Sequence, residues 1–398
     1  MSHWKAQEIG KLVKPVVTWN PLKADHDDEF DYIDLSAVDQ DTKTITAPKK
    51  IACSEAPSRA RQIVSANDVL VSTVRPNLNG VARVPFELDQ ATASTGFCVL
   101  RTRSDSLNSS YLFHWVKSPQ FVAEMTKKAT GQSYPAVSDK IISESLIPVP
   151  PLPEQIRIAA ILDQADALRV KRREALAQLD SLTQAIFIDM FGDPVANQKG
   201  WEKKTFSKLL EKAEVFVDGD WVESKDQDPE GGVRLVQLAD IGDGYYVNKS
   251  ARFLNKPTAT RLKCTVLKQG DVLIARMPDP LGRACLFPGD EKECVTVVDV
   301  CIVRTKNNEP DHTWLMCCIN SHAFRSEIAG EATGATRVRI SRGNLSRLEI
   351  IAPPIALQRE FADRISVVDK LKTAHSASLT ELDNLFDSLQ HRAFRGEL

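Results

Sequence analysis

Residues 147–155 read Ile-Pro-Val-Pro-Pro-Leu-Pro-Glu-Gln, and residues 350–358 read Ile-Ile-Ala-Pro-Pro-Ile-Ala-Leu-Gln. Both stretches contain two adjacent prolines, with a glutamine four positions after the second proline. Proline is disfavoured inside a helix but fits its first turn, so each stretch predicts the start of a helix. The two stretches lie 203 residues apart, and the same offset recurs elsewhere in the chain.

The offset of 203 residues aligns the chain with itself over more than a hundred positions. Asp68–Val71 matches Asp271–Ile274, and Cys98–Thr102 matches Cys301–Thr305. Chance does not produce one unbroken offset over such a length, and internal repetition of this kind determines the architecture. The chain is therefore predicted to be two copies of one unit, each with a globular part followed by a helical part.

The helical parts follow the proline pairs. Residues 154–189 contain neither glycine nor proline, and apolar residues recur at every third or fourth position; residues 361–389 repeat this spacing. Each helix would span about 36 residues, or roughly 55 Å. Neither can bury so long an apolar stripe on its own small domain, so we expect an antiparallel coiled coil of the two. The alternative is that each helix packs only on its own domain.

The globular parts are predicted to mix strands and helices. Two apolar runs follow Asn-Asp and Gly-Asp turns, as strands commonly do, and two others have the same character. Two longer segments have helical spacing of Leu, Phe, Trp and Ile. The expected strands are Asp68–Ser72, Asp271–Ala275, Phe97–Arg101 and Val297–Arg304, and the expected helices are Ser110–Met125 and His312–Ile328.

The predicted fold class is therefore α+β, a mixed α/β architecture. Two tandem, pseudo-symmetric domains are separated by two long antiparallel helices that form a coiled coil. The predicted division places the first globular domain at residues 1–152, the first helix at 153–192, the second globular domain at 193–352 and the second helix at 353–398.

Composition excludes several classes of protein. The chain has 398 residues, of which 42% are hydrophobic and 26% charged, as is typical of globular domains. No run approaches the roughly 18 apolar residues of a membrane span. The start, Met1–Lys5, lacks the apolar core of a signal peptide, so we expect a cytoplasmic protein.

The formal net charge of −2 does not by itself suggest a nucleic-acid binder. Charge is nevertheless unevenly distributed along the chain. Residues 25–41 hold eight acidic and no basic side chains, whereas residues 42–150 hold 13 basic and 8 acidic ones. The near-neutral total is an average over patches of opposite sign, which is compatible with DNA contact through a limited set of loops.

Taken together, these segments resemble the specificity subunit of type I restriction–modification systems. The second copy departs from the family's pattern because it lacks the Pro-Glu pair before its glutamine. The resemblance covers essentially the whole chain, including its tandem organisation. It rests on residues 147–155, Ile158–Asp163, Met190–Pro194 with Gly200 and Trp201, the ending Ala393–Leu398, and Asp68–Pro76.

The resemblance implies a function in phage defence. Each globular part would be a target-recognition domain that reads one half of a bipartite, asymmetric double-stranded DNA sequence. The helices would act as a spacer, and two methyltransferase subunits and the restriction/translocase subunits would assemble on this scaffold. S-adenosylmethionine, ATP and magnesium would belong to those partner chains. A spacer of about 55 Å is long enough for half-sites separated by a helical turn of roughly 34 Å.

The residues expected to contact DNA lie in loops. Base edges are read best by Arg, Lys, Asn and Gln, whereas phosphates accept any basic or hydroxyl donor. The alternative is that these loops are simply solvated surface. The candidates in the first copy are Arg75, Asn77 and Asn79, with a second cluster of Lys127, Lys128, Gln132, Ser133 and Tyr134; those in the second copy are Arg276, Thr336, Arg337, Arg339 and Arg342.

The sequence predicts no catalytic residues and no metal site on this chain. It lacks glycine-rich nucleotide loops, the nucleophile elbow of hydrolases and the Asp/Asn-Pro-Pro-aromatic motif of amino methyltransferases. Pro278-Asp279 followed by Asp290-Glu291-Lys292 matches a loose nuclease pattern, but both pieces have the composition of turns. Besides this metal-dependent nuclease, the other alternative is a non-catalytic protein–protein scaffold or adaptor of a defence system.

The eight cysteines include no Cys-x-x-Cys pair. His312, Cys317, Cys318 and His322 form the nearest approach to a metal cluster, but their spacing fits no familiar zinc site. We expect the two cysteines to be buried in a helix, as free cysteines commonly are.

Overall fold

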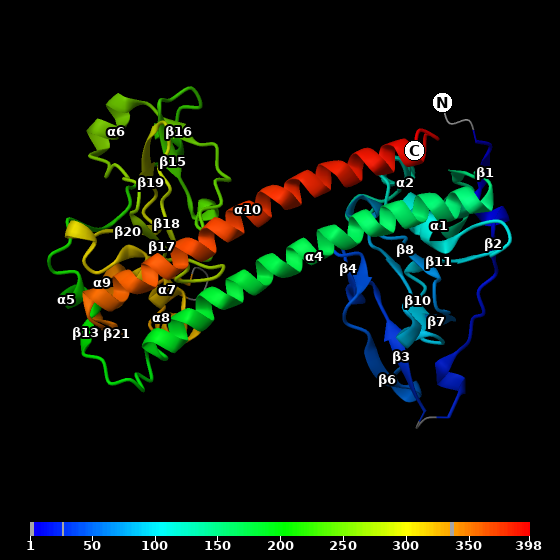
Figure 1. Ribbon diagram of the computed structural model, residues 1–398, viewed down its shortest axis with the longest axis horizontal. Helices are drawn as coiled ribbons and strands as arrows, with labels where there is room; N and C mark the ends of the chain where they lie inside the picture. The colour runs from blue at the N-terminus through cyan, green and yellow to red at the C-terminus, as the bar shows by residue number, and fades with distance from the viewer. Residues whose placement is uncertain (1–3, 26–27, 335–337) are drawn as a thin grey trace. The chain divides into compact units, whose positions relative to one another are not determined.

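The computed structural model describes residues 4–25, 28–334 and 338–398 (Figure 1). The chain forms two compact units: unit 1 comprises residues 1–174 and 375–398, and unit 2 comprises residues 175–374. Both boundaries fall inside long helices, α4 (Leu152–Phe191) and α10 (Ile355–Ala393), so each unit contains part of both. Within the described part of the chain, no helix has the length and apolarity needed to cross a membrane.

Unit 1 contains two four-stranded sheets. One is antiparallel, in the order β2 (Val13–Lys14), β11 (Phe97–Thr102), β8 (Val69–Ser72) and β9 (Val81–Arg83). The other has the order β6 (Lys49–Ala52), β3 (Glu29–Ile33), β10 (Thr92–Ser94) and β7 (Ala60–Ile63), with β3 and β10 parallel. Two small pairs are β1 (Ala6–Glu8) with β12 (Leu146–Pro148), and β4 (Val38–Asp39) with β5 (Thr44–Ile45). The short helices are α1 (Ser109–Val116), α2 (Pro119–Lys128) and α3 (Asp139–Ser143).

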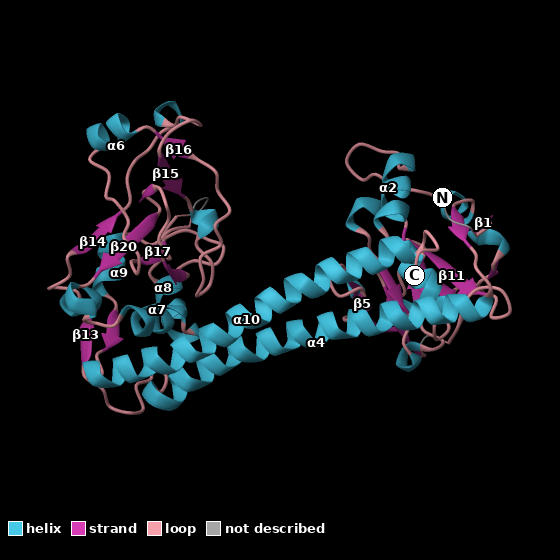
Figure 2. Ribbon diagram, turned by 45° about the horizontal axis from the view of Figure 1, so that its top comes forward, coloured by secondary structure: helices cyan, strands magenta, loops and turns pink. Residues whose placement is uncertain are grey.

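Unit 2 repeats this plan. Its antiparallel sheet has the order β14 (Val215–Asp218), β20 (Val300–Arg304), β17 (Val272–Ala275) and β18 (Ala284–Leu286). Its second sheet has the order β16 (Phe253–Leu254), β15 (Val233–Val236) and β19 (Glu293–Thr296), with β15 and β19 parallel. β13 (Lys203–Thr205) pairs with β21 (Glu349–Ile351). The short helices are α5 (Phe206–Leu209), α6 (Lys256–Leu262), α7 (His312–Asn320), α8 (His322–Gly330) and α9 (Arg342–Arg347) (Figure 2).

The predicted duplication is confirmed at the level of individual strands. The offset of 203 residues carries β8 onto β17 and β9 onto β18 residue for residue. β8 and β17 are each buried on both faces, which explains why the sequence of each strand is a continuous apolar run. Val69 and Val71 face the core beneath α1, whereas Leu70 faces the core between the two sheets. The mixed fold and the tandem organisation are both as the sequence predicts.

A glutamine after each pair of adjacent prolines, Gln155 or Gln358, connects the start of a long helix to its globular part through hydrogen bonds. Gln155 Oε1 accepts a hydrogen bond from Asn108 N at 2.9 Å, and Gln155 Nε2 donates to Pro150 O at 2.9 Å. Gln358 repeats both contacts, accepting from Asp311 N at 2.9 Å and donating to Pro353 O at 2.8 Å. Both side chains are buried, so the recurring glutamine has a structural role in each copy.

Within each unit, segments of α4 and α10 lie side by side and run antiparallel (Figures 1 and 2). In unit 1, Arg172 contacts His375 at 3.1 Å, and Arg169 Nε donates to Asp383 Oδ1 at 2.6 Å. Residue numbers of the paired positions therefore decrease along α4 as they increase along α10, as in antiparallel helices. In unit 2, Lys372 pairs with Asp180 at 2.9 Å. The predicted antiparallel pairing is confirmed, and the alternative in which each helix packs only on its own domain is wrong.

Aromatic side chains attach both long helices to each globular part. In unit 1, Phe394, immediately after α10, lies 5.3 Å from Tyr111 and 4.9 Å from Trp115, measured between ring centroids. In unit 2, the matching residue at the end of α4, Phe191, lies 6.3 Å from Trp314 and 5.4 Å from Phe361. Each globular part is thus packed by the start of one long helix and the end of the other.

One expectation about the globular parts needs correction. The segments at residues 110–125 and 312–328 are each two helices rather than one, with breaks at Ser118 and Ser321. Each serine has extended backbone, and its hydroxyl accepts a hydrogen bond from the N–H three residues later, at 3.3 Å. An N-cap of this kind starts a new helix while the apolar spacing continues across the break.

Removing the cap at Ser321 provides a test of this break. Ser321→Ala is expected to lower the free energy of unfolding by about 1 kcal/mol, because the N-terminal N–H groups of α8 lose a hydrogen-bond acceptor. Chemical denaturation would measure the change. Ser326→Ala, within the same helix, is the matched control and should change stability by less than about 0.5 kcal/mol. Equal effects of the two substitutions would contradict the capping role.

Candidate nucleic-acid interface

Two predicted clusters of unit 1 come together on one surface. The loop after β8 contains Arg75, and the loop after α2 contains Tyr134, nearly 60 residues later. Arg75 N donates to Pro135 O at 2.7 Å, and Val137 N donates to Thr73 O at 2.9 Å. The guanidinium of Arg75 lies over the Tyr134 ring, 4.7 Å from its centroid. These contacts join the two loops along their length.

We call residues 73–80 and 127–137, the second of which begins with the last two residues of α2, the reading loops of unit 1. Most of the predicted DNA-contacting side chains in them are exposed, and Tyr134 is 68% exposed. Lys128 Nζ pairs with Glu124 at 2.6 Å, whereas Lys127 has no ion pair among the described residues. The exposed candidates are Arg75, Asn77, Lys127, Lys128, Gln132, Ser133 and Tyr134.

Asn79 occupies a different position from the other candidates. It is half-buried, and its Nδ2 donates to Lys117 O at 3.2 Å. Its carbonyl accepts a hydrogen bond from Lys43 Nζ at 2.6 Å. Asn79 therefore anchors the loop rather than presenting a free amide edge.

Lys43 is a residue that sequence reasoning missed. It lies in the turn between β4 and β5 and has a positive φ of 58°. Burial lowers the pKa of Lys43, nearby Lys117 lowers it further, and Asp41 and Asp39 oppose both effects. The sequence showed only a basic residue in a turn-like stretch after the acidic segment. It did not indicate that Lys43 contacts a residue 36 positions away.

The glycine at the centre of each predicted loop has a conformational role. Gly131 has a φ of 104° and Gly334 a φ of 108°, a region that disfavours other residues. A Cβ atom on Gly131 would lie 3.0 Å from the Tyr134 carbonyl oxygen. The glycine therefore allows the loop to close on itself, and the bridge between Thr130 and Ala136 recurs in unit 2 between Thr333 and Arg339.

Arg276 is not on the exposed surface of unit 2, which corrects the prediction that it contacts DNA. Its side chain is 1% exposed, and its guanidinium donates to Ile340 O at 3.2 Å and to Val298 O. Arg276 Nε lies 3.2 Å from Asp218 Oδ1. The offset of 203 residues places Arg276 opposite Thr73, a buried anchor of the first copy, and not opposite Arg75.

The other candidates of unit 2 differ in how far their side chains are engaged. Arg339 is exposed and has no ion pair among the described residues. Arg342 is 44% exposed, but its Nη1 donates to Phe216 O at 2.8 Å and its Nε lies 3.7 Å from Asp218. Thr336 and Arg337 lie outside the described residues.

The nuclease-like residues are held apart by a strand. Asp279 precedes β18 and Asp290 follows it. Asp290 accepts a hydrogen bond from Arg234 at 3.0 Å, and the ammonium of Lys292 lies 4.5 Å from the Phe253 ring centroid. Across the described ranges, no three His, Cys, Asp or Glu side chains are grouped as metal ligands would be. Asp290 and Lys292 thus each contact another side chain of unit 2.

The histidine and cysteine segment forms part of the core of unit 2. Cys318 is buried in α7, and Cys317 beside it is half-buried. Burial raises the pKa of both thiols. His312 accepts a hydrogen bond from Thr305 N at 3.0 Å, and burial lowers the pKa of its ring. The expected burial in a helix is confirmed for Cys318.

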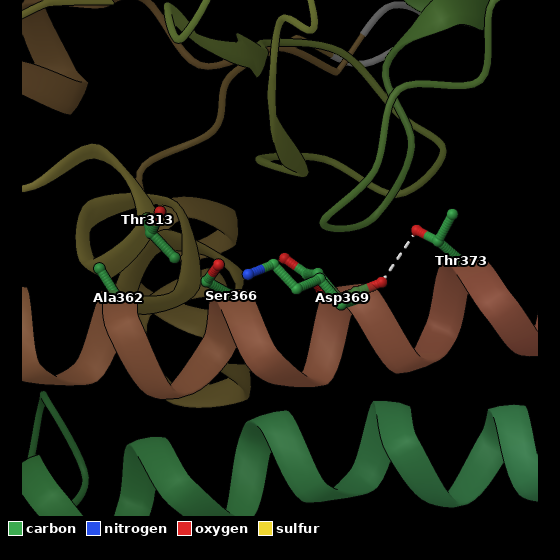
Figure 3. Close-up of a pocket in the computed structure, with 6 residues that line it drawn as sticks. Thr313, Ala362, Ser366, Asp369 and Thr373 are labelled. Atoms are coloured by element: carbon green, nitrogen blue, oxygen red, sulfur yellow. Dashed lines mark hydrogen bonds between the residues drawn. The ribbon is translucent and has the colours of Figure 1, made fainter.

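A cavity of about 480 Å³ lies between α10 and the start of α7 in unit 2 (Figure 3). Burial raises the pKa of Asp369, and Thr373 Oγ1 donates to the Asp369 carbonyl at 2.9 Å. In unit 1, Asp163 and Ser110 occupy the positions of Ser366 and Thr313. There the long helix is bonded directly to the short one, because Asp163 accepts hydrogen bonds from Ser110 and His114 at 2.6 and 2.8 Å. The cavity offers hydroxyls, a carboxylate and an ammonium, which bind polar groups. It is lined by Thr313, Ala362, Ser366, Asp369, Lys370 and Thr373.

The sequence is similar to specificity subunits of type I restriction enzymes. Residues 23–179 match the family model described as the type I restriction modification DNA specificity domain. The MjaVIII specificity subunit of a type I restriction enzyme from Methanocaldococcus jannaschii is 23% identical over 319 residues, covering 78% of this chain and 74% of the relative. The EcoBI specificity subunit from Escherichia coli is 21% identical over 336 residues, covering 76% and 68%.

Solved structures match over almost the full length. A chain from a study of complex assembly and conformational transition of the type I R-M system is 28% identical, with a TM-score of 0.59 over 99% of this chain and 98% of the other. The S subunit of a type I restriction–modification system from M. genitalium has a TM-score of 0.57 over 99% and 96%, at 14% identity. The second match concerns the fold alone.

Proposed function

Because this chain is similar to the specificity subunits of type I restriction–modification systems, we propose that it is one of them and that each of its two units reads one half of a bipartite, asymmetric DNA sequence. The observation that carries the proposal is the repetition of one loop arrangement in both units. In each unit, a loop after the central strand is bonded to a glycine-centred loop, through Thr73 and Val137 in one copy and Arg276 and Ile340 in the other.

The two sets of loops have the same backbone plan but different side chains. Arg75 and Ala136 of the first copy are matched by Pro278 and Arg339 of the second. A symmetric dimer of one reader would suffice for a palindrome, whereas two diverged readers on one chain suit a target whose halves differ. The divergence therefore favours an asymmetric target.

The chemistry of the exposed side chains suits duplex DNA. Arginine, lysine, asparagine and glutamine supply hydrogen bonds to base edges, and lysines with hydroxyl groups supply phosphate contacts. The reading loops of unit 1 present all of these types on one surface. Exposed loops held by a rigid scaffold are where binding residues usually lie.

The paired helices of this chain and its partner subunits would perform the remaining tasks. The paired helices α4 and α10 would set the spacing between half-sites and dock two methyltransferase subunits, which the restriction/translocase subunits then join. S-adenosylmethionine, ATP and magnesium would be bound by those partners, and this chain would be non-catalytic. The assembly would act in the cytoplasm on genomic and invading DNA.

A lysine of the reading loops tests the phosphate contacts. Lys127→Ala is expected to weaken binding to every duplex by a similar factor and to lower the slope of log K against log salt by about 1. Fluorescence anisotropy with the chain assembled with its methyltransferase subunits would measure both quantities. Lys11→Ala, outside the loops, is the matched control and should leave the slope unchanged.

The same titration tests the proposed function itself. The wild-type assembly should bind one bipartite sequence more tightly than scrambled duplexes at every salt concentration. Binding with no sequence preference would contradict the proposal and favour the scaffold or adaptor alternative.

A further inference from the structure

The backbone around Arg75 is restrained on both sides. Arg75 has a φ of 49°, and its N–H donates to Pro135 O at 2.7 Å. Four residues later, Asn79 has a φ of 47° and is bonded to Lys117 O through its side chain and to Lys43 Nζ through its carbonyl. The short turn between them, Pro76–Leu78, begins with a proline, which further limits its conformations. The position of Arg75 is therefore set by three separate segments of unit 1.

The side chain of Arg75 is held by stacking. Its guanidinium carbon lies 4.7 Å from the centroid of the Tyr134 ring. The N–H groups of the guanidinium have no hydrogen-bond acceptor among the described residues, and the side chain is exposed. Stacking on an aromatic ring uses the face of the guanidinium and leaves its in-plane N–H groups available.

A guanidinium held in this way matches one DNA base best. The fork of two parallel N–H donors fits O6 and N7 of guanine in the major groove, the commonest specific contact between a protein and DNA. Phosphate would also accept such donors, but lysine can bind phosphate as a point charge without a fixed orientation, and Lys127 and Lys128 at the end of α2 are available for that contact. Restraint of both backbone and side chain is valuable mainly where geometry must be selective.

We propose that Arg75, stacked on Tyr134, reads a guanine in the half-site recognised by unit 1. The inference rests on the proposed function and specifies it at one residue. The second copy has Pro278 at this position and so lacks the equivalent donor. The requirement for this guanine would therefore belong to one half of the target only. Lys43 and Asn79 are positioning residues, since they hold the loop and not the base.

The test is a set of duplexes in which each base pair of the target is replaced in turn. They are titrated with the full chain assembled with its methyltransferase subunits, in wild-type, Arg75→Ala and Arg75→Lys forms. Wild type should show a loss of roughly 5- to 150-fold at one G·C pair. Arg75→Ala should abolish the loss at that pair and leave the losses at all other positions intact. Arg75→Lys should retain the charge but lose most of this discrimination, because it lacks the planar fork.

The possible outcomes separate the inference from the proposed function. Arg59→Ala, which removes an exposed arginine outside the reading loops, should change no base preference. If Arg75→Ala weakened binding to all duplexes equally and kept every base preference, Arg75 would be a phosphate contact and the inference would be overturned alone. If wild type had no base preference at all, the proposed function would be overturned together with the inference.

Discussion

Replacing Arg337 and Arg339 together with alanine is expected to abolish specific binding to the cognate site. Arg339 is exposed, is held by the bridge between Thr333 and Arg339, and has no ion pair among the described residues. Arg337 lies outside the described residues and enters through the sequence prediction alone. Two lost base contacts would together cost about 2–6 kcal/mol, a large part of the roughly 4–10 kcal/mol by which specific binding exceeds non-specific binding. Gel-shift titration of the assembled complex with its cognate duplex measures the loss.

The control removes one arginine at another exposed position of unit 2. Arg347→Ala removes an exposed arginine of α9 whose guanidinium donates to Asn344 at 2.6 Å. It should change cognate affinity only slightly. Circular dichroism would establish that the double variant keeps its fold. Unchanged cognate affinity in a folded double variant would remove this loop from the recognition surface.

Asp271→Ala is expected to destabilise unit 2 by about 3–5 kcal/mol, because it leaves a charge without its buried partner. Asp271 is 1% exposed, and its two carboxylate oxygens accept hydrogen bonds from Arg304 at 2.8 and 2.7 Å. It also accepts a hydrogen bond from Lys268 N at 2.8 Å. Asp68 and Arg101 form the same arrangement in unit 1, so the pair is a repeated structural device. Urea denaturation followed by tryptophan fluorescence would measure the change.

An exposed ion pair of the same unit is the matched control. Asp243 pairs with Arg325 through a carboxylate that is 53% exposed. Asp243→Ala should change the free energy of unfolding by about 0–1 kcal/mol, since solvent screens such pairs. A loss of similar size in both variants would mean that burial is not the cause of the effect at Asp271.

Local sequence signals predicted the strands well and the helix breaks poorly. β8 and β17 follow Asn-Asp and Gly-Asp turns and are buried on both faces, so their apolar runs could be recognised without tertiary information. The breaks at Ser118 and Ser321 were missed because the three- and four-residue spacing of apolar side chains continues through them. Ser118 is followed by proline, which favours the first turn of a helix and was a usable signal.

The candidate site was predicted in part, and the failures have physical causes. Residue types and loop positions identified Arg75 and Tyr134, but the contact between them spans nearly 60 residues and depends on how two loops pack. Arg276 was predicted to contact DNA because arginine commonly does so. The offset of 203 residues, however, aligns it with Thr73, which is buried in the first copy. The sequence did not indicate the partner of Lys43, because that partner is a backbone carbonyl, which every residue possesses.

If this chain specifies a bipartite DNA target for methylation, its presence must decide which genomic sites are methylated. The most direct measurement is methylation mapping of the host genome, with and without the gene for this chain, in a strain that has its methyltransferase partners. We expect one motif, made of two different half-sites at a fixed spacing, to be methylated only when the gene is present. Identical methylation patterns in the two strains would contradict it.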